Sequence, residues 1–173
     1  MGLPRDILSA RVRNEVNMCK AQLRHEISVS DSSFSRFPVE IDVTLLKSPG
    51  PVLRAGSVTH AYTHKLKIIV TEHYPYEKPI VRWQSPIFHP NIMIPRDGGY
   101  VCTKLLDDWA FHSTLVTFIK GIETLLMNPN PGNPYGSESC MLAAEYFRMH
   151  SYAPPVIVES AAKPRIVQGG QDA

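Results

Sequence analysis

Cysteine is scarce in this chain of 173 residues, which contains only Cys19, Cys102 and Cys140. An odd, widely spaced set of cysteines argues against a disulfide framework and favours a reducing compartment, so we expect a cytoplasmic protein. The cysteines and the seven histidines also form no spaced quartet of the kind that binds structural zinc. The sequence therefore predicts no metal site.

An excess of charge of one sign is missing as well. The formal net charge is +2 at pH 7, which is too small to indicate nucleic-acid binding. No apolar run is long enough to cross a bilayer, and residues 1–13 do not have the pattern of a signal peptide. No glycine-rich loop of the kind that holds phosphate groups occurs. We therefore expect no nucleic acid or membrane as a partner, and no cofactor.

The overall composition and length are typical of a globular domain of ordinary size. Hydrophobic residues make up 43% of the chain and charged residues 20%, and this length allows a real hydrophobic core. Periodic patterns occupy residues 1–152, which we interpret as one domain. Residues 153–173, which begin with APPVIVES, predict an extended or partly disordered tail.

An amphipathic helix is predicted over residues 5–24. Its apolar side chains recur at intervals of three and four residues, at Leu8, Val12, Val16, Cys19 and Leu23. The arginine and lysine side chains lie largely off this stripe. They form either a solvated face or a docking surface for an acidic partner.

Alternating apolar and polar residues predict four strands after this helix, over residues 26–31, 37–46, 60–73 and 80–85. Consecutive strands of this kind most simply form an antiparallel meander. Loop-like sequence follows over 86–113, and two further helices are predicted over 113–128 and 137–150. The fold class is therefore α+β, with an N-terminal helix, a four-stranded antiparallel meander, a long loop and two C-terminal helices.

Five short motifs follow one another from the fourth strand onward. They are YPYEKPIVRW at 74–83, HPN at 89–91, GGYVC at 98–102, Trp109, and NPNPGNP at 128–134. Together they resemble the ubiquitin-conjugating enzymes, over about residues 5–150. The resemblance implies the conjugating-enzyme fold, in which residues 1–152 are the catalytic core and the loop over 86–113 is the active-site loop. It also implies that the protein accepts ubiquitin or a ubiquitin-like modifier from an activating enzyme as a thioester on Cys102 and transfers it to a lysine amine, usually with a ligase.

Cys102 and Asn91 have side chains suited to such a reaction. A thiolate is a good nucleophile and a good leaving group, so a cysteine can hold an acyl group and release it to an amine. The reaction passes through an oxyanion, and the Asn91 amide can donate a hydrogen bond to that charge. Alternatively, this amide only ties down its loop through backbone hydrogen bonds. Because the interval from Asn91 to Cys102 is longer than the common family spacing, either the extra residues bulge outward or Asn91 is displaced.

His89 and Asn133 complete the set of candidate catalytic residues. The resemblance implies that His89 braces the loop and is not a general base. Asn133 stands where the family often has an acidic residue that orients the lysine, and an asparagine can accept a hydrogen bond but cannot carry charge. Tyr135 lies just beyond, where we expect a packing role.

The resemblance also implies the partner surfaces. By position, the candidates are Arg5, Tyr76, Ala110, Phe111 and His112, which would contact the activating enzyme and a ligase of the RING type. Phe111 replaces the usual proline of this loop, so it either forms an apolar knob of different shape or folds into the core. A monomer is the family default.

Two other functional classes remain as alternatives. One is a conjugating-enzyme-like interaction module with weak or no activity. The presence of Cys102 argues against it, whereas Asn133 and the longer interval between Asn91 and Cys102 slightly favour it. The other is a Cys-His hydrolase, which would need a third group to orient His89 and a buried specificity pocket. Neither of these features is evident in the sequence.

Overall fold

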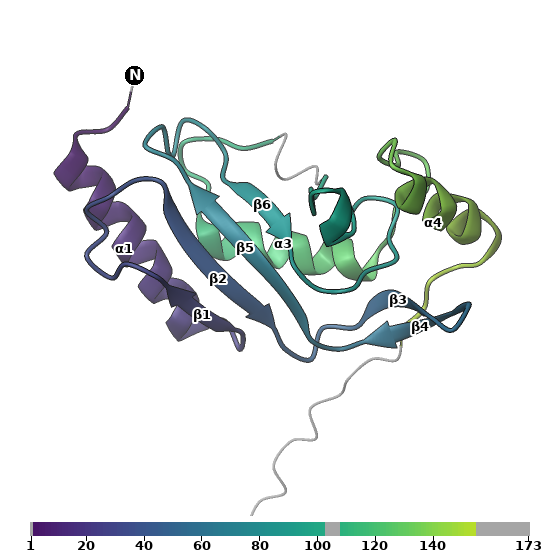
Figure 1. Ribbon diagram of the computed structural model, residues 1–173. Helices are drawn as coiled ribbons and strands as arrows, with labels where there is room; N and C mark the ends of the chain where they lie inside the picture. Colours follow the sequence, from purple (N-terminus) through teal and green to yellow (C-terminus); the bar gives the residue numbers. More distant parts are fainter. Residues whose placement is uncertain (1, 103–107, 155–173) are drawn as a thin grey trace, which may run out of the picture.

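The computed structural model describes residues 2–102 and 108–154 (Figure 1). Its elements in chain order are α1 (Arg5–Gln22), β1 (Glu26–Val29), β2 (Val39–Leu45), β3 (Gly50–Arg54), β4 (Ser57–Ala61), β5 (His64–Val70), β6 (Ile80–Trp83), the 3-10 helix η1 (Pro95–Asp97), α3 (Leu115–Met127) and α4 (Glu138–Met149). The predicted α+β class and the order of helix, antiparallel sheet and two helices are confirmed. The predicted tail lies almost entirely outside the described residues.

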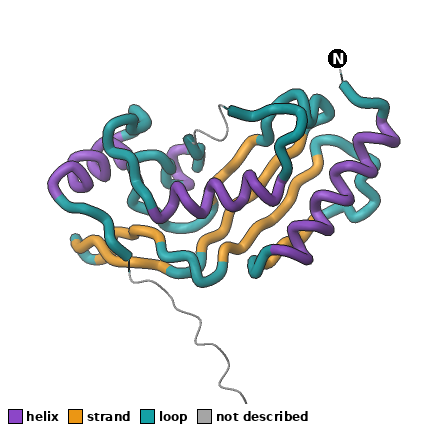
Figure 2. Tube along the Cα trace, turned by 180° about the vertical axis from the view of Figure 1, so that it is seen from behind, coloured by secondary structure: helices purple, strands orange, loops and turns teal. Residues whose placement is uncertain are grey.

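The central sheet has four antiparallel strands in the order β1-β2-β5-β6. Alternate residues of β2 are buried, and Val43 is paired with Leu66 of β5 in the register. This alternation turns one face of the sheet toward the core. Figure 2 shows α3 crossing the sheet, with α1 beside it. The apolar stripe of α1 is buried in the same core, at Leu8, Val12, Val16 and Cys19.

A separate hairpin corrects the predicted strand pattern. Residues 60–73 were expected to form one strand, but β4 ends at Ala61 and β5 begins at His64. The strands β3 and β4 pair only with each other among the described strands. Their turn is Ala55-Gly56, in which both residues have positive φ (49° and 78°). A two-residue turn with this backbone matches the twist of the flanking strands, and Ala55 gives little sequence signal for it.

The two later helices begin at side-chain caps near the predicted positions. The Thr114 side chain accepts a hydrogen bond from the Thr117 backbone N–H, and the Thr117 side chain completes a capping box before α3. The Ser137 side chain accepts from the backbone N–H of Cys140 at the start of α4. Such caps satisfy N–H groups that have no partner inside the helix. Within residues 2–102 and 108–154, no helix is both long and apolar enough to cross a membrane.

Candidate active site

Cys102 lies directly after a short antiparallel bridge between Ile92 and Val101. Its backbone N–H donates a hydrogen bond of 2.9 Å to the carbonyl oxygen of Asn91, and the residue is partly exposed. All three cysteines are described and free, but Cys19 and Cys140 are buried. Burial raises the pKa of the Cys19 thiol to about 12, with a smaller effect from Glu15. A buried thiol of this kind is a poor nucleophile. Of the three cysteines, Cys102 is therefore the one best placed to act as a nucleophile.

The extra residues between Asn91 and Cys102 form a compact turn. After η1, Gly98 and Gly99 have positive φ (110° and 67°), which glycine adopts without strain. The carbonyl of Gly99 accepts a hydrogen bond of 2.7 Å from the backbone N–H of Trp83. The turn therefore bulges from the end of the sheet, and the backbone of Asn91 stays hydrogen-bonded to the backbone of Cys102.

The side chain of Asn91 is buried and fully engaged with the loop at 128–134. Its Nδ2 donates to the carbonyl oxygens of Asn130 and Asn133, each at 3.0 Å. Its Oδ1 accepts a hydrogen bond of 2.8 Å from the backbone N–H of Asn130. Both amide hydrogens are thus committed to backbone acceptors. Of the two roles considered for Asn91, this arrangement favours tying down the loop.

His89 is buried and bonded to the backbone through both ring nitrogens. Nδ1 accepts from the backbone N–H of Asn91 at 3.0 Å, so the proton is assigned to Nε2, which donates to the Leu125 carbonyl at 2.9 Å. Burial lowers the pKa of His89 to about 4, and the nearby His64 adds a smaller effect. The ring is therefore a neutral brace. Because both nitrogens have backbone partners, a Cys-His hydrolase pair has no support here.

Asn133 and Tyr135 lie on the loop that Asn91 holds. The carbonyl of Asn133 receives the Asn91 amide, whereas the residue as a whole is exposed. The backbone N–H of Tyr135 donates a hydrogen bond of 3.0 Å to the carbonyl of Pro90. The 128–134 loop is thus fixed to residues 90 and 91, which directly precede the bridge between Ile92 and Val101.

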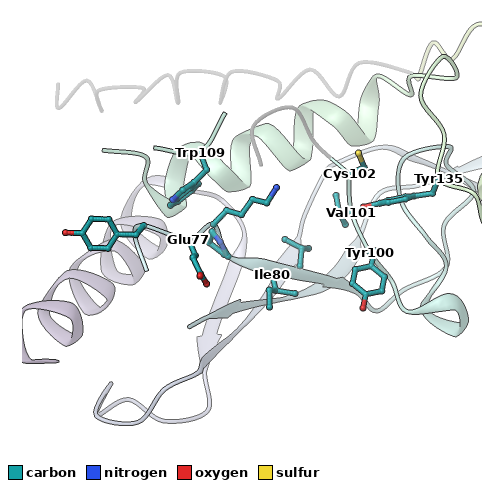
Figure 3. Close-up of a pocket in the computed structure, with 11 residues that line it drawn as sticks. Glu77, Ile80, Tyr100, Val101, Cys102, Trp109 and Tyr135 are labelled. Carbon is teal, nitrogen blue, oxygen red and sulfur yellow. The ribbon is translucent and has the colours of Figure 1, made fainter. Parts of the chain in front are cut away.

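A cavity of about 630 Å³ opens beside Cys102 and is drawn in Figure 3. Ile80 and Val81 of β6 lie on one side of it, and Trp109 and Tyr135 line it as well. The exposed ring of Tyr100 packs on the guanidinium of Arg82, 3.7 Å from the ring centroid. The site is therefore a partly exposed thiol at the edge of an aromatic and aliphatic groove. Among the described residues, no group of three or more His, Cys, Asp or Glu is arranged to hold a metal ion.

A family model described as "Ubiquitin-conjugating enzyme" matches residues 12–152. The chain belongs to this family. The match runs from α1 to the residues just after α4, so it includes Cys102 and both loops that frame it. The family resemblance seen in the motifs is confirmed.

Two curated relatives carry the same family name. The chain is 35% identical over 99 residues to "Ubiquitin-conjugating enzyme E2 3" of Arabidopsis thaliana, covering 57% of this chain and 65% of that protein. It is 30% identical over 136 residues to "Probable ubiquitin-conjugating enzyme E2 L460" of Acanthamoeba polyphaga mimivirus, covering 76% of this chain and 80% of that protein. The chain thus spans slightly less than two thirds of the Arabidopsis relative.

Two solved structures share the fold. S. cerevisiae Ubc12 superposes with a TM-score of 0.60 at 23% identity, covering 81% of this chain and 76% of that one. A ubiquitin-conjugating enzyme E2 domain of Toxoplasma gondii gives a TM-score of 0.58 at 21% identity, covering 81% and 89%. At this level of identity the structures support the fold of the family and no finer property.

Two of the predicted partner residues form one exposed aromatic surface. The rings of Tyr76 and Phe111 lie 5.3 Å apart, and the two residues are 56% and 49% exposed. The alternative in which Phe111 folds into the core is therefore wrong. The Arg11 guanidinium lies 4.9 Å from the Phe111 ring centroid and donates to the Phe111 carbonyl at 2.6 Å. Arg11 gave no sequence signal beyond a basic residue off the apolar stripe.

The remaining predicted partner residues flank this surface. Ala110 is half-buried, and its backbone N–H donates to the Ser113 hydroxyl at 3.1 Å. His112 is exposed, as is Arg5 at the start of α1. Arg5 lines a small depression together with Glu72, which shortly precedes the turn carrying Tyr76. Most of the predicted partner residues are thus open to contact.

A buried carboxylate, which the sequence pattern did not reveal, positions this surface. Glu15 of α1 accepts hydrogen bonds from the Tyr74 hydroxyl (2.8 Å) and the Leu115 backbone N–H (2.9 Å). It also pairs with Arg11 at 3.0 Å. Burial, and then the negative charge of Glu15, raise the pKa of Tyr74. Glu15 therefore joins α1, the turn before β6 and the N-terminus of α3, where a negative charge is favourable.

Proposed function

We propose that this protein accepts ubiquitin or a ubiquitin-like modifier from an activating enzyme as a thioester on Cys102 and then transfers it to a lysine amine. The observation that carries the proposal is the accessibility of Cys102 beside a groove, with Asn91 as its backbone neighbour. The two other cysteines are buried. Membership of the conjugating-enzyme family supports the same assignment.

The proposed reaction has two acyl transfers. In the first, the Cys102 thiolate attacks the carbonyl carbon of a thioester on the activating enzyme, a new C–S bond forms, and the old C–S bond breaks to release the activating enzyme's thiolate. In the second, a lysine amine attacks the same carbonyl carbon, and Cys102 leaves. Neither step consumes a cofactor on this chain, because the acyl group arrives already activated.

We further propose that a ligase of the RING type assists the second transfer by binding the surface formed by Tyr76 and Phe111. Exposed aromatic side chains are enriched at the centres of protein interfaces, which supports this assignment. The free cysteines are consistent with a reducing compartment, and we propose the cytoplasm. We also propose that the protein acts as a monomer, which is the family default.

A charging assay tests the proposal. The protein is mixed with ATP, a modifier and the matching activating enzyme, for ubiquitin and for each of several ubiquitin-like proteins, and the products are run on gels with and without reductant. The wild type should gain one modifier that reductant removes. Cys102→Ser should gain a reductant-resistant oxyester or nothing, whereas Cys140→Ser, which changes a buried thiol, should behave as the wild type.

Failure would take a specific form. If folded wild-type protein gains no modifier from any activating enzyme, the proposed function is contradicted and the interaction-module alternative is favoured. If Cys102→Ser is charged as a reductant-sensitive thioester, the acceptor is another cysteine and the assignment of Cys102 is wrong.

A further inference from the structure

One cavity-lining side chain has a polar group at the Cys102 end of the cavity and no role in the proposed function. Tyr135 lines the cavity together with Cys102. Figure 3 shows its ring at the end of the cavity that holds Val101 and Cys102, with the hydroxyl beside Val101. A phenolic hydroxyl can both donate and accept a hydrogen bond. Its position therefore invites a role in the chemistry at the thiol.

The backbone holds Tyr135 in a fixed position relative to Cys102. Its N–H is bonded to the Pro90 carbonyl, and the preceding part of its loop is bonded to the Asn91 side chain at Asn130 and Asn133. The carbonyl oxygen of Asn91 in turn accepts a hydrogen bond of 2.9 Å from the backbone N–H of Cys102. Five hydrogen bonds thus connect the two sides of the cavity through residues 90 and 91. A group on such a frame needs little reorganisation to act, which is the condition for effective positioning.

The other polar residues of the cavity are less suited to meet an incoming amine. Figure 3 shows the carboxylate of Glu77 and the hydroxyl of Tyr100 pointing away from Cys102. The Trp109 indole N–H is a donor only and is bonded to the Pro75 carbonyl at 2.6 Å. Lys78 carries the same charge as a lysine substrate. Of the labelled polar groups, the Tyr135 hydroxyl is the acceptor that lies at the end of the cavity holding Val101 and Cys102.

Neither neighbouring asparagine takes this role in the observed geometry. Both amide hydrogens of Asn91 are committed to backbone carbonyls. Asn133 is exposed, and its carbonyl is one of those acceptors. The loop therefore brings Tyr135, and not its asparagines, to the groove beside Cys102.

We propose that the hydroxyl oxygen of Tyr135 accepts a hydrogen bond from the incoming lysine amine and holds its nitrogen against the thioester on Cys102. This inference rests on the proposed function. The neutral amine, which has lost its extra proton to solvent, forms a C–N bond to the thioester carbonyl carbon. The C–S bond breaks, its electron pair goes to the Cys102 sulfur, and the second nitrogen proton passes through solvent to the thiolate. The products are an isopeptide and the free Cys102 thiol.

This role predicts an effect on one transfer only. Transfer from the activating enzyme to Cys102, and discharge of Cys102 to a small thiol, have a sulfur nucleophile with no N–H to donate. Tyr135→Phe should therefore leave these two rates unchanged. Discharge to free L-lysine should slow about fivefold at sub-saturating lysine, as expected for the loss of one hydrogen bond of ordinary strength.

The experiment compares wild type, Tyr135→Phe and Tyr100→Phe after single-turnover charging with the modifier and activating enzyme that load the wild type. Each charged protein is split between L-lysine and 2-mercaptoethanesulfonate, and the loss of thioester is followed on non-reducing gels. Tyr100→Phe is the matched control, because it removes a hydroxyl from the same cavity that points away from Cys102. Thermal unfolding of all three proteins checks that the fold is retained.

The outcomes are separable. A slower lysine discharge in Tyr135→Phe alone, with normal charging and normal thiol discharge, supports the inference. Equal slowing with both nucleophiles would overturn it, because that pattern belongs to an oxyanion donor or to a change in the site's shape. Unchanged lysine discharge would also overturn it while leaving the proposed function intact. If the wild type takes no modifier at all, both proposals fail.

Discussion

The backbone N–H of Cys102 donates a hydrogen bond of 2.9 Å to the carbonyl of Asn91, while the Asn91 side chain binds the 128–134 loop at Asn130 and Asn133. One residue thus joins the backbone of Cys102 to a loop about forty positions later in the chain. The link to Cys102 uses only backbone atoms. Side-chain substitutions at Asn91 therefore test the attachment of the loop without removing the backbone hydrogen bond between Asn91 and Cys102.

Replacing Asn91 with alanine should destabilise the protein, because three side-chain hydrogen bonds are lost at a buried position. At about 1 kcal/mol for each bond, the free energy of unfolding should fall by about 2–3 kcal/mol. Urea unfolding measures this loss, and the backbone amide of Asn130 should exchange its hydrogen faster. Asn128→Ala, which removes one exposed bond to the Thr124 carbonyl, is the control and should cost less than about 1 kcal/mol.

The same variant distinguishes the two roles of Asn91. If Asn91→Ala unfolds like the wild type but discharges to lysine about a hundredfold more slowly, the amide acts as an oxyanion donor. The loop-tying role would then be contradicted, because it requires a measurable loss of stability.

The buried His89 should make stability depend on pH in a mildly acidic range. Its pKa is lowered by burial from 6.5 to about 4, so the unfolded chain binds the proton more readily than the folded chain. The contribution of the neutral His89 ring to the free energy of unfolding is complete above about pH 6.5 and is lost as the pH falls toward 4. The loss should be on the order of 3 kcal/mol.

Unfolding by urea at several pH values, for wild type and His89→Gln, measures this dependence. The glutamine keeps a donor for the Leu125 carbonyl but does not titrate. We expect the wild type to be the more stable protein at pH 7 and its advantage to shrink between pH 6.5 and 4. A constant difference across that range would show that His89 does not titrate with a lowered pKa.

Gly99 should tolerate no side chain. Its φ is 67°, and a Cβ built there would lie 2.7 Å from the Trp83 backbone nitrogen. Gly99→Ala must therefore displace either the turn before Cys102 or the end of β6, at an expected cost of about 2 kcal/mol or more. Gly136→Ala is the control, since a Cβ at that position meets no atom within 4 Å. Equal melting temperatures for the two variants would contradict the tight packing of the turn.

The sequence predicted those parts of the fold that depend on local signals. The stripe of α1 and the alternation in β2 each involve residues a few positions apart, so their patterns are visible without the structure. The Ala55-Gly56 turn was missed because one of its two positive-φ residues is an alanine, which rarely adopts that conformation.

The site was only partly predictable, for a physical reason. Cys102, Asn91 and His89 belong to short motifs and could be named. The contacts that define their roles join distant residues, such as Glu15 with Leu115 or Asn91 with Asn130. Pairings of this kind arise from the packing of whole elements and leave no spacing pattern. The same holds for the direction of the Tyr135 side chain, where only a packing role had been expected.

Phe111 offers the sharpest test of the proposed ligase surface. Its ring is 49% exposed and packs on Tyr76, whereas its contact with Arg11 through a hydrogen bond uses the backbone carbonyl. Phe111→Ala should therefore keep the fold and normal charging. It should lower the stimulation of lysine discharge by RING domains by at least about tenfold, the usual cost of truncating a central aromatic side chain. Leu142→Ala, which truncates an apolar side chain that is 53% exposed on α4, should leave stimulation unchanged. Stimulation that survives Phe111→Ala, or that falls equally in Leu142→Ala, would place the ligase on another face.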